Sequence, residues 1–404
     1  MRSHCGESMY QSSPQRVLVV SPEAGRLDAM RKVKGLAWET IYAADSARAL
    51  ELLQCDPIDV VLADRELRGP TNGEALLRMV RDLSPDTALM AIEARAIAAT
   101  DKKSLALLAV DRGAQAPVVA AMFERAYRIH KLLTNPQTAK VVGALGELPS
   151  VPETYWELSR VTAKPNCTVA EVAAIVQSDP ALSVKVLQMV NSAFFGLSRR
   201  VSSIAQAVSY LGLELLKGLV LNAHVFAAID ASHTKGFSLE RFQLYSVRCA
   251  RLARKFVGES KLGDDAFTAA IVHDIGELVL AMQHPDKYSQ VVAQSVDSGR
   301  PADELEREII GASHAEAGAV TLASCGIPFS VVECVAFHHH PSLVSGGPRE
   351  VLAAVHAADA LIGILTCGDP ESRLDVAFLE SAGVGHRVEE WEKWAQDEVA
   401  TWES

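Results

Sequence analysis

The stretch AFTAAIVHDIGELVLAM (residues 266–282) sets a His-Asp pair, His273-Asp274, inside a long apolar run. Its apolar residues recur with the period of about 3.6 residues that marks an α-helix. The same rhythm continues through most of the chain that follows residue 150. It is clearest in ALSVKVLQMV (181–190), IAQAVSYLGLELLKGLVL (204–221), YSVRCARLARKFV (245–257) and VLAAVHAADALIGIL (351–365). We therefore predict that the second half of the chain is all helical.

The beginning of the chain has a different pattern, in which short β-branched runs alternate with helical segments. This alternation is typical of parallel βαβ units. The predicted strands are residues 16–21, 40–43, 58–64 and 87–92, with a weak fifth strand at 115–119. The predicted helices include residues 46–54, 73–83, 104–113 and 120–133. In such a sheet, functional groups lie at the carboxyl ends of the strands, here near Ser21 and Asp64.

These patterns divide the 404-residue chain into segments. We predict a disordered N-terminus (1–15), an α/β domain (16–134), a linker (135–147), an all-helical domain (148–370) and a C-terminal helical extension (371–404). The extension carries Trp391, Trp394 and Trp402 at helical spacing on an acidic helix. Such an aromatic stripe must be buried against something, by default its own domain and alternatively a second copy of the chain or a partner.

Composition narrows the class of protein. The chain is 49% hydrophobic and 22% charged, which predicts a globular protein. The net charge of -11 argues against general nucleic-acid binding, because phosphate contacts need clustered Lys and Arg. The first 15 residues lack the apolar core of a signal peptide, no stretch approaches the roughly 20 apolar residues of a membrane span, and the seven cysteines are scattered. We expect a cytoplasmic protein with reduced thiols and no membrane contact.

Histidines and carboxylates gather in the predicted helical half. The candidate metal ligands are His273, Asp274, His314, His338, His339, His340 and Asp359. Imidazole nitrogen and carboxylate oxygen together suit Fe, Mn or Zn, and such a metal makes hydroxide from bound water. The same groups could instead hydrogen-bond to one another and hold a polar core together without a metal. His356 lies three residues before Asp359, so we expect the two to share a helix face and to orient one another.

Residues 16–134 resemble a response-regulator receiver domain, and Asp64 in VVLADREL matches the phospho-accepting Asp of that family. The resemblance also implies an acidic pair for Mg²⁺, a hydroxyl and a Lys after the first, fourth and fifth strands. Ser21-Pro22, Glu93-Ala94 and the Lys-free APVVAAM stand at those places. Because Mg²⁺ needs several hard oxygen ligands, we expect a degenerate receiver in which Asp64 is a solvated or helix-capping carboxylate. Phosphorylation of Asp64 is the alternative.

A second resemblance rests on LPSVP (148–152), SDPALSVKVLQMVNSAFFGLSRRVSSIAQAVSYLG (178–212), VHDIGELVL (272–280), ASHAEAG (312–318), FHHHP (337–341) and VHAADAL (355–361). These segments are similar to an HDOD domain, the output-domain relative of the HD and HD-GYP phosphodiesterases. The resemblance implies that the metal positions are His273, Asp274, His314, His338, His339 and Asp359. It also implies a His where this chain has Tyr245, and the GYP segment is missing. A phenol loses its proton only at a pH of about 10 and is a poor replacement ligand.

The two resemblances imply a bacterial cytoplasmic signalling protein, which we expect to act by protein–protein contact and not by catalysis; composition and spacing alone do not show this role. The resemblances imply two-component or cyclic-di-GMP networks, with a histidine kinase, a cyclase or another regulator as partner, and a homodimer is an alternative contact. A metal-dependent phosphohydrolase that uses Fe, Mn or Zn on a nucleotide or cyclic dinucleotide is the second interpretation. A sensor that binds such a nucleotide without cutting it is the third. Residues 194–200 form either a loop that contacts a partner or anionic ligand, or a tight turn.

Overall fold

The computed structural model describes residues 15–22, 38–67, 71–93, 107–143, 153–162, 164, 166–190, 201–213, 216–220, 237–258, 260–324, 327–346, 348–367 and 374–400. Residues 1–14 of the predicted disordered N-terminus (1–15), the predicted loop or tight turn at 194–200 and Trp402 lie outside these ranges. The chain divides into two compact units. The sheet unit is Met1–Pro136 with Leu343–Pro348, and the helical unit is Gln137–Ser342 with Arg349–Ser404.

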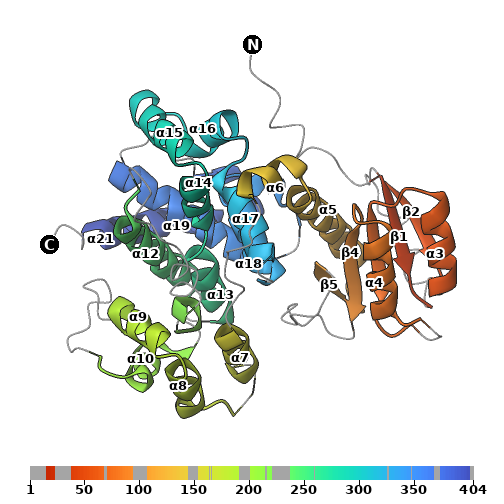
Figure 1. Cartoon of the computed structure of the whole chain (residues 1–404), viewed down its shortest axis with the longest axis horizontal. Coiled ribbons are helices and arrows are strands. Elements are labelled where there is room, and N and C mark those ends of the chain that lie inside the picture. The colour runs from red at the N-terminus through yellow and green to blue at the C-terminus, as the bar shows by residue number, and fades with distance from the viewer. Residues whose placement is uncertain are drawn as a thin grey trace. The chain divides into compact units, whose positions relative to one another are not determined.

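The sheet unit contains a five-stranded sheet with the order β2-β1-β3-β4-β5, in which every neighbouring pair is parallel. Its strands are β1 (Arg16–Val20), β2 (Glu39–Ala43), β3 (Val60–Asp64), β4 (Ala88–Glu93) and β5 (Leu108–Asp111). The helices described in this unit are α3 (Ser46–Cys55), α4 (Gly73–Leu83) and α5 (Ala116–Leu133) (Figure 1). This arrangement confirms the predicted α/β, receiver-like fold.

Both faces of the sheet are buried, because successive side chains of a strand point to opposite sides. Leu18 and Val61 face the layer of α3 and α4, where they pack with residues such as Leu76. Val19 and Leu62 face the other layer and pack with residues of α5 such as Phe123. Burial on both faces explains why the central strands read as continuous apolar runs in the sequence.

One part of the sequence prediction for this unit is wrong. Residues 104–113 were expected to be helical and residues 115–119 to be the fifth strand, but the fifth strand is Leu108–Asp111 and α5 begins at Ala116. A short apolar run does not distinguish a buried strand from a helix by its period alone. Pro117 lies in the first turn of α5, where a proline is compatible with helix. The carboxyl end of the fifth strand therefore leads to Arg112.

The helical unit confirms the predicted all-helical second half. Within the described residues its helices are α6 (Pro136–Val142), α7 (Glu153–Thr162), α8 (Val169–Gln177), α9 (Pro180–Val190), α10 (Ile204–Leu211), α12 (Leu239–Val257), α13 (Lys261–Ala270), α14 (Ile275–Gln283), α15 (Pro285–Ser298), α16 (Ala302–Ile309), α17 (His314–Ser324), α18 (Phe329–Phe337), α19 (Glu350–Cys367), α20 (Val376–Ser381) and α21 (Val388–Ala400). Helix α6 falls within the predicted linker, and its Val141 and Val142 pack with Leu280 of α14. None of the helices described is both long enough and apolar enough to cross a bilayer.

A glycine brings two of these helices close together. A Cβ atom added at Gly276, near the start of α14, would lie 1.8 Å from the backbone oxygen of His314, at the start of α17. A side chain is therefore excluded where the two backbones meet. The Ile-Gly step after His273-Asp274 thus fixes the separation between that pair and His314.

The C-terminal helix α21 packs onto the helical unit. Trp391 is buried and stacks on Phe256 with the ring centroids 4.4 Å apart. Trp394 stacks on the same ring at 6.3 Å, and the guanidinium of Arg387 lies over both indoles. Both tryptophans pack against their own unit, Trp391 fully buried and Trp394 partly exposed.

Candidate metal centre

Five polar side chains converge inside the helical unit, because helices start or end at each of them. His273 and Asp274 lie in the turn between α13 and α14, and His314 is the first residue of α17. His338 and His339 directly follow α18. The exposed fraction is 0% for His273 and His338, 3% for His314 and 6% for Asp274, so four of the five are buried from water.

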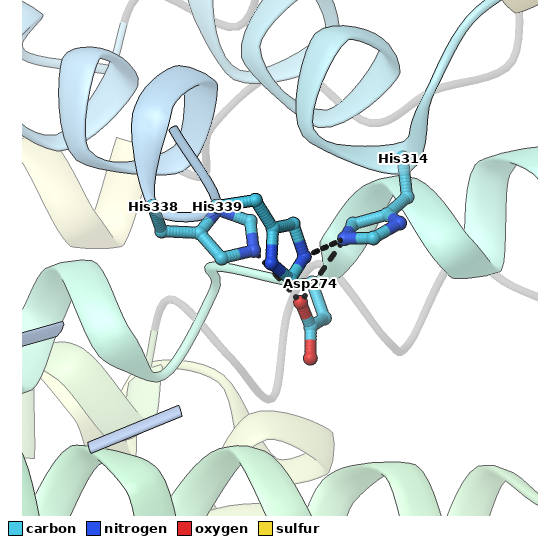
Figure 2. Close-up of side chains that lie close together, drawn as sticks. All are labelled: Asp274, His314, His338 and His339. Carbon is cyan, nitrogen blue, oxygen red and sulfur yellow. Dashed lines mark hydrogen bonds and ion pairs between the residues drawn. The ribbon is translucent and has the colours of Figure 1, made fainter. Parts of the chain in front are cut away.

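Four of these residues, Asp274, His314, His338 and His339, form what we call the Asp274 cluster, and Figure 2 shows their side chains pointing toward one another. His314 Nε2 lies 2.8 Å from His339 Nε2. Asp274 Oδ1 lies 3.4 Å from His338 Nε2 and 3.6 Å from His314 Nε2. Ligand atoms around one ion, each bound at about 2.1 Å, are expected to lie roughly 3 to 3.5 Å apart. The four ligand atoms all lie within 4.8 Å of one another, which is compatible with a single divalent cation.

The outer ring nitrogens support the same interpretation. His338 Nδ1 lies 2.8 Å from the Val335 carbonyl oxygen, and His314 Nδ1 lies 2.7 Å from Glu306 Oε2. Since a carbonyl or carboxylate oxygen accepts, each Nδ1 carries the proton, and Nε2 presents its lone pair to the cluster when the ring is neutral. His338 Nε2 is buried and makes no hydrogen bond to any described residue. With the Asp274 carboxylate near it, at 3.4 Å, this imidazole nitrogen fits a cation ligand.

A second group, Cys249, His273 and Asp359, adjoins the cluster through Asp274. His273 Nε2 lies 2.9 Å from Asp274 Oδ2 and 3.3 Å from Asp359 Oδ1. The hydroxyl of Tyr245 donates a hydrogen bond to the same Asp359 Oδ1 at 2.7 Å. Burial and the neighbouring Asp359 raise the pKa of Tyr245 well above its ordinary value, so the phenol remains a neutral donor. Tyr245 thus binds one of the two carboxylate oxygens that Asp359 could offer to a second cation.

Protonated imidazoles supply positive charge to this interior when no cation is bound. Burial alone would lower the pKa of His273, but the carboxylates of Asp274 and Asp359 raise it well above its ordinary value. Burial opposes a charge on His314 too, yet the Glu306 carboxylate raises its pKa to about 10. Burial and the neighbouring His338 hold the pKa of His339 well below its ordinary value, so that ring stays neutral. A cation in the Asp274 cluster would replace the extra proton of His314, because a ligating imidazole nitrogen must be deprotonated.

The sheet unit has a carboxylate of its own at the end of β3, Asp64, which is 4% exposed. Arg112, directly after β5, donates from Nη2 to Asp64 Oδ1 at 2.7 Å and from Nη1 to Glu66 Oε2 at 2.7 Å. The Ser21 hydroxyl approaches Asp64 Oδ2 at 3.4 Å. Asp64 is therefore paired and buried, and the predicted solvated or helix-capping carboxylate is wrong. The sequence prediction missed Arg112 because it placed the fifth strand too late, although the receiver resemblance implies a basic residue after that strand.

Two other predicted residues have different roles. His356 Nδ1 lies 2.6 Å from the His338 carbonyl oxygen, and its Nε2 accepts from the Asp375 N–H at 2.8 Å. The predicted orientation of Asp359 by His356 is wrong, since both ring nitrogens are used elsewhere. His340 Nε2 lies 3.0 Å from Asp303 Oδ2, outside the Asp274 cluster. Glu306, which binds His314, was not predicted.

Comparisons with known proteins agree with this architecture. Residues 148–341 match the HDOD domain family. An uncharacterized protein of Treponema pallidum (strain Nichols) is 25% identical over 212 residues, which make up 51% of this chain and 40% of that protein, so this chain matches less than half of its relative. A solved structure from Marinobacter aquaeolei VT8, provisionally named a signal transduction protein, is 19% identical, covers 94% of this chain and 83% of its own, and has a TM-score of 0.50. A solved structure from Shewanella amazonensis SB2B, provisionally named a phosphohydrolase, is 26% identical and has a TM-score of 0.49. The match covers 65% of this chain and 95% of that structure's chain. Residues 148–341 of this chain are therefore an HDOD domain, and a receiver-like α/β unit precedes it.

Proposed function

We propose that this chain is a signalling regulator that acts through contacts with other signalling proteins, and that its HDOD domain holds one divalent cation without turning over a nucleotide. The HDOD domain and the signal-transduction name of a structural neighbour support a signalling-related role. The partners proposed are members of two-component or cyclic-di-GMP networks, such as a histidine kinase or a cyclase. The observation that carries the non-catalytic mode is the Tyr245 hydroxyl on Asp359 Oδ1, at 2.7 Å.

A single cation disfavours turnover at this site. Two-metal sites stabilise both the attacking and the leaving oxygen of a phosphoryl displacement. In this chain Asp274, His314, His338 and His339 would hold one Fe, Mn or Zn ion, which would supply positive charge between buried carboxylates. The neighbouring group is already satisfied by hydrogen bonds from within the chain. A single cation with four protein ligands is typical of a structural site.

The sheet unit supports the same conclusion. Phosphoryl transfer to an aspartate needs a metal ion beside the acceptor. Asp64 Oδ1 is instead paired with the guanidinium of Arg112, which also holds Glu66. We propose that this unit docks to a partner without receiving phosphate. Incubation of the whole chain with acetyl phosphate and Mg²⁺ is then expected to leave its intact mass unchanged, and a phosphoryl adduct lost in Asp64→Asn would contradict this.

A phosphohydrolase is the second candidate, and one observation favours it. The side chain of His339 is 31% exposed while the rest of the cluster is buried, so the cation position adjoins solvent on that side. An open coordination position is what separates a catalytic from a structural site. There a bound cation would activate water.

The discriminating experiment is a turnover assay on the whole chain loaded with Fe²⁺, Mn²⁺ or Zn²⁺. Cyclic-di-GMP and a set of nucleoside mono-, di- and triphosphates serve as substrates, and chromatography detects products. The proposal predicts neither product nor saturable nucleotide binding. Turnover that disappears in Asp274→Ala would establish the hydrolase, and saturable binding without product would establish a nucleotide sensor.

A further inference from the structure

One carboxylate oxygen of Glu306 accepts two hydrogen bonds from His314. Glu306 lies in the last turn of α16 and is fully buried, with 0% exposure. Its single oxygen Oε2 accepts from the backbone N–H of His314 at 2.6 Å and from the ring Nδ1 of the same residue at 2.7 Å. Two bonds to one oxygen fix both the start of α17 and the rotation of the imidazole, so the ring has one orientation.

That orientation is the one a cation needs. With Nδ1 bound to Glu306, Nε2 lies 2.8 Å from His339 Nε2 and 3.6 Å from Asp274 Oδ1. A carboxylate on the outer nitrogen also makes the inner nitrogen of a ligating imidazole more basic, and therefore a stronger metal ligand. Glu306 thus controls both the direction and the donor strength of His314.

The surroundings of Glu306 keep this geometry rigid. Its neighbour Arg307 donates to Asp303 Oδ2 at 2.7 Å and to Glu316 Oε1 at 3.1 Å. Glu316 in turn accepts from the Ser313 backbone N–H at 2.9 Å, while the Ser313 hydroxyl accepts from the Glu316 N–H at 3.2 Å. This capping box fixes the first turn of α17. The position of His314 is therefore fixed both by Glu306 and by the capping box at the start of α17.

The other oxygen of Glu306 also lies in the buried interior. Oε1 is buried and makes no hydrogen bond to any residue that the structure describes. A buried carboxylate with an unsatisfied oxygen is costly unless a positive charge lies near it. The protonated His314 ring supplies that charge without a cation, and an ion bound at His314 Nε2 would supply it in place of the proton.

We infer that Glu306 is a positioning residue of the cation centre, which sets the orientation and donor strength of His314 and thereby the affinity for the metal. The inference rests on the proposed cation at the Asp274 cluster. Loss of a carboxylate behind a ligating histidine typically weakens metal binding about 10- to 100-fold.

Chelator-competition titration with Zn²⁺ tests the inference on the whole chain. Glu306→Gln keeps an acceptor oxygen and removes the charge, and Glu306→Ala removes both. The matched control is Glu308→Gln on the same helix, whose side chain is 63% exposed and pairs with Arg300. We expect Zn²⁺ affinity to fall about 10- to 100-fold in Glu306→Ala and by a smaller factor in Glu306→Gln, with no change in the control.

A spectroscopic measurement separates positioning from a general effect on folding. In the Zn²⁺-loaded protein, the Nδ1 proton of His314 is expected to resonate further downfield in the wild type than in Glu306→Gln, while the backbone spectrum is retained. Wild-type affinity in Glu306→Gln would overturn the inference and leave the proposed cation in place. A wild-type chain that binds no Zn²⁺ would overturn the cation proposal and the inference together.

Discussion

The carboxylate sites of the two units share a construction and differ in where the positive charge comes from. In each, a glycine lies against the backbone of a site residue. A Cβ atom at Gly73 would lie 2.0 Å from the backbone oxygen of Asp64, and one at Gly276 would lie 1.8 Å from the backbone oxygen of His314. In the sheet unit the charge is the Arg112 guanidinium, which belongs to the chain. In the helical unit the carboxylate faces imidazole nitrogens that an ion could use. The first site is closed by a side chain of the chain itself, whereas the second offers the donor atoms that the proposed cation would use.

The largest effect is expected from Gly276→Ala. The new methyl group would meet the His314 backbone, which cannot move without shifting α17. We expect a loss of about 3 kcal/mol in the free energy of unfolding, at the upper end of overpacking effects, together with loss of metal. Urea unfolding measures the first. The control is Gly113→Ala, whose Cβ would meet only the Asp111 carboxylate at 3.1 Å; equal behaviour of the two variants would show that the close approach has no structural role.

Arg112→Ala tests whether the sheet-unit site is closed. The substitution leaves Asp64 buried without its ion pair, and Arg112 itself is 27% exposed, so solvent screens part of the effect. We expect unfolding to become easier by about 1 to 3 kcal/mol. The matched control is Arg81→Ala, which breaks an exposed pair with Asp82 and should cost less than about 0.5 kcal/mol. Similar midpoints for the two variants would mean that Arg112 does not hold Asp64.

Tyr245→Phe tests whether the tyrosine hydroxyl keeps a second cation out of the group formed by Cys249, His273 and Asp359. Removal of the hydroxyl frees Asp359 Oδ1, beside His273 and Cys249. We expect a destabilisation of about 1.5 kcal/mol and an increase from one to two bound Zn²⁺ at saturation, measured by equilibrium dialysis. Tyr210→Phe, at a residue that is 59% exposed, is the control and should change neither quantity. A stoichiometry that stays at one in Tyr245→Phe would contradict the role given to the hydroxyl.

The smallest effect concerns pH. The pKa of His314 is raised from 6.5 to about 10 in the metal-free fold, so its protonation stabilises that fold fully below pH 6.5. This stabilisation is lost as the pH rises through about 10. Bound Zn²⁺ removes the dependence, because the ligating nitrogen has no proton to lose. Melting curves between pH 6.5 and 10 should therefore show a Zn²⁺-induced gain in Tm that grows by a few degrees with pH, and a gain that shrinks with pH would contradict the assignment.

The predictability of the two sites differs for a physical reason. The helical period and the β-branched runs identify both fold classes, because each reflects one burial pattern along a single element. Asp64, Asp274 and His314 stand out because they interrupt apolar runs. Glu306 does not: in ADELEREI a glutamate looks like one of several solvent-facing charges, and only the packing of α16 shows that it is buried.

The sequence prediction missed the role of Arg112 for another reason, because it placed this residue in a helix. The run LAVD before it fits a strand as well as a helix, and only its pairing with β4 decides between them. A register error of a few residues then moved the sheet edge away from the basic residue. A local sequence pattern does not show which side chains of a neighbouring strand or helix reach a site.

The metal content of the purified protein tests the single-cation centre. Protein purified without chelator is analysed by inductively coupled plasma mass spectrometry beside Asp274→Ala. One Fe, Mn or Zn ion per wild-type chain, absent from the variant, is the predicted result. Two ions per chain, or far less than one in a well-folded protein, would contradict the single-cation centre.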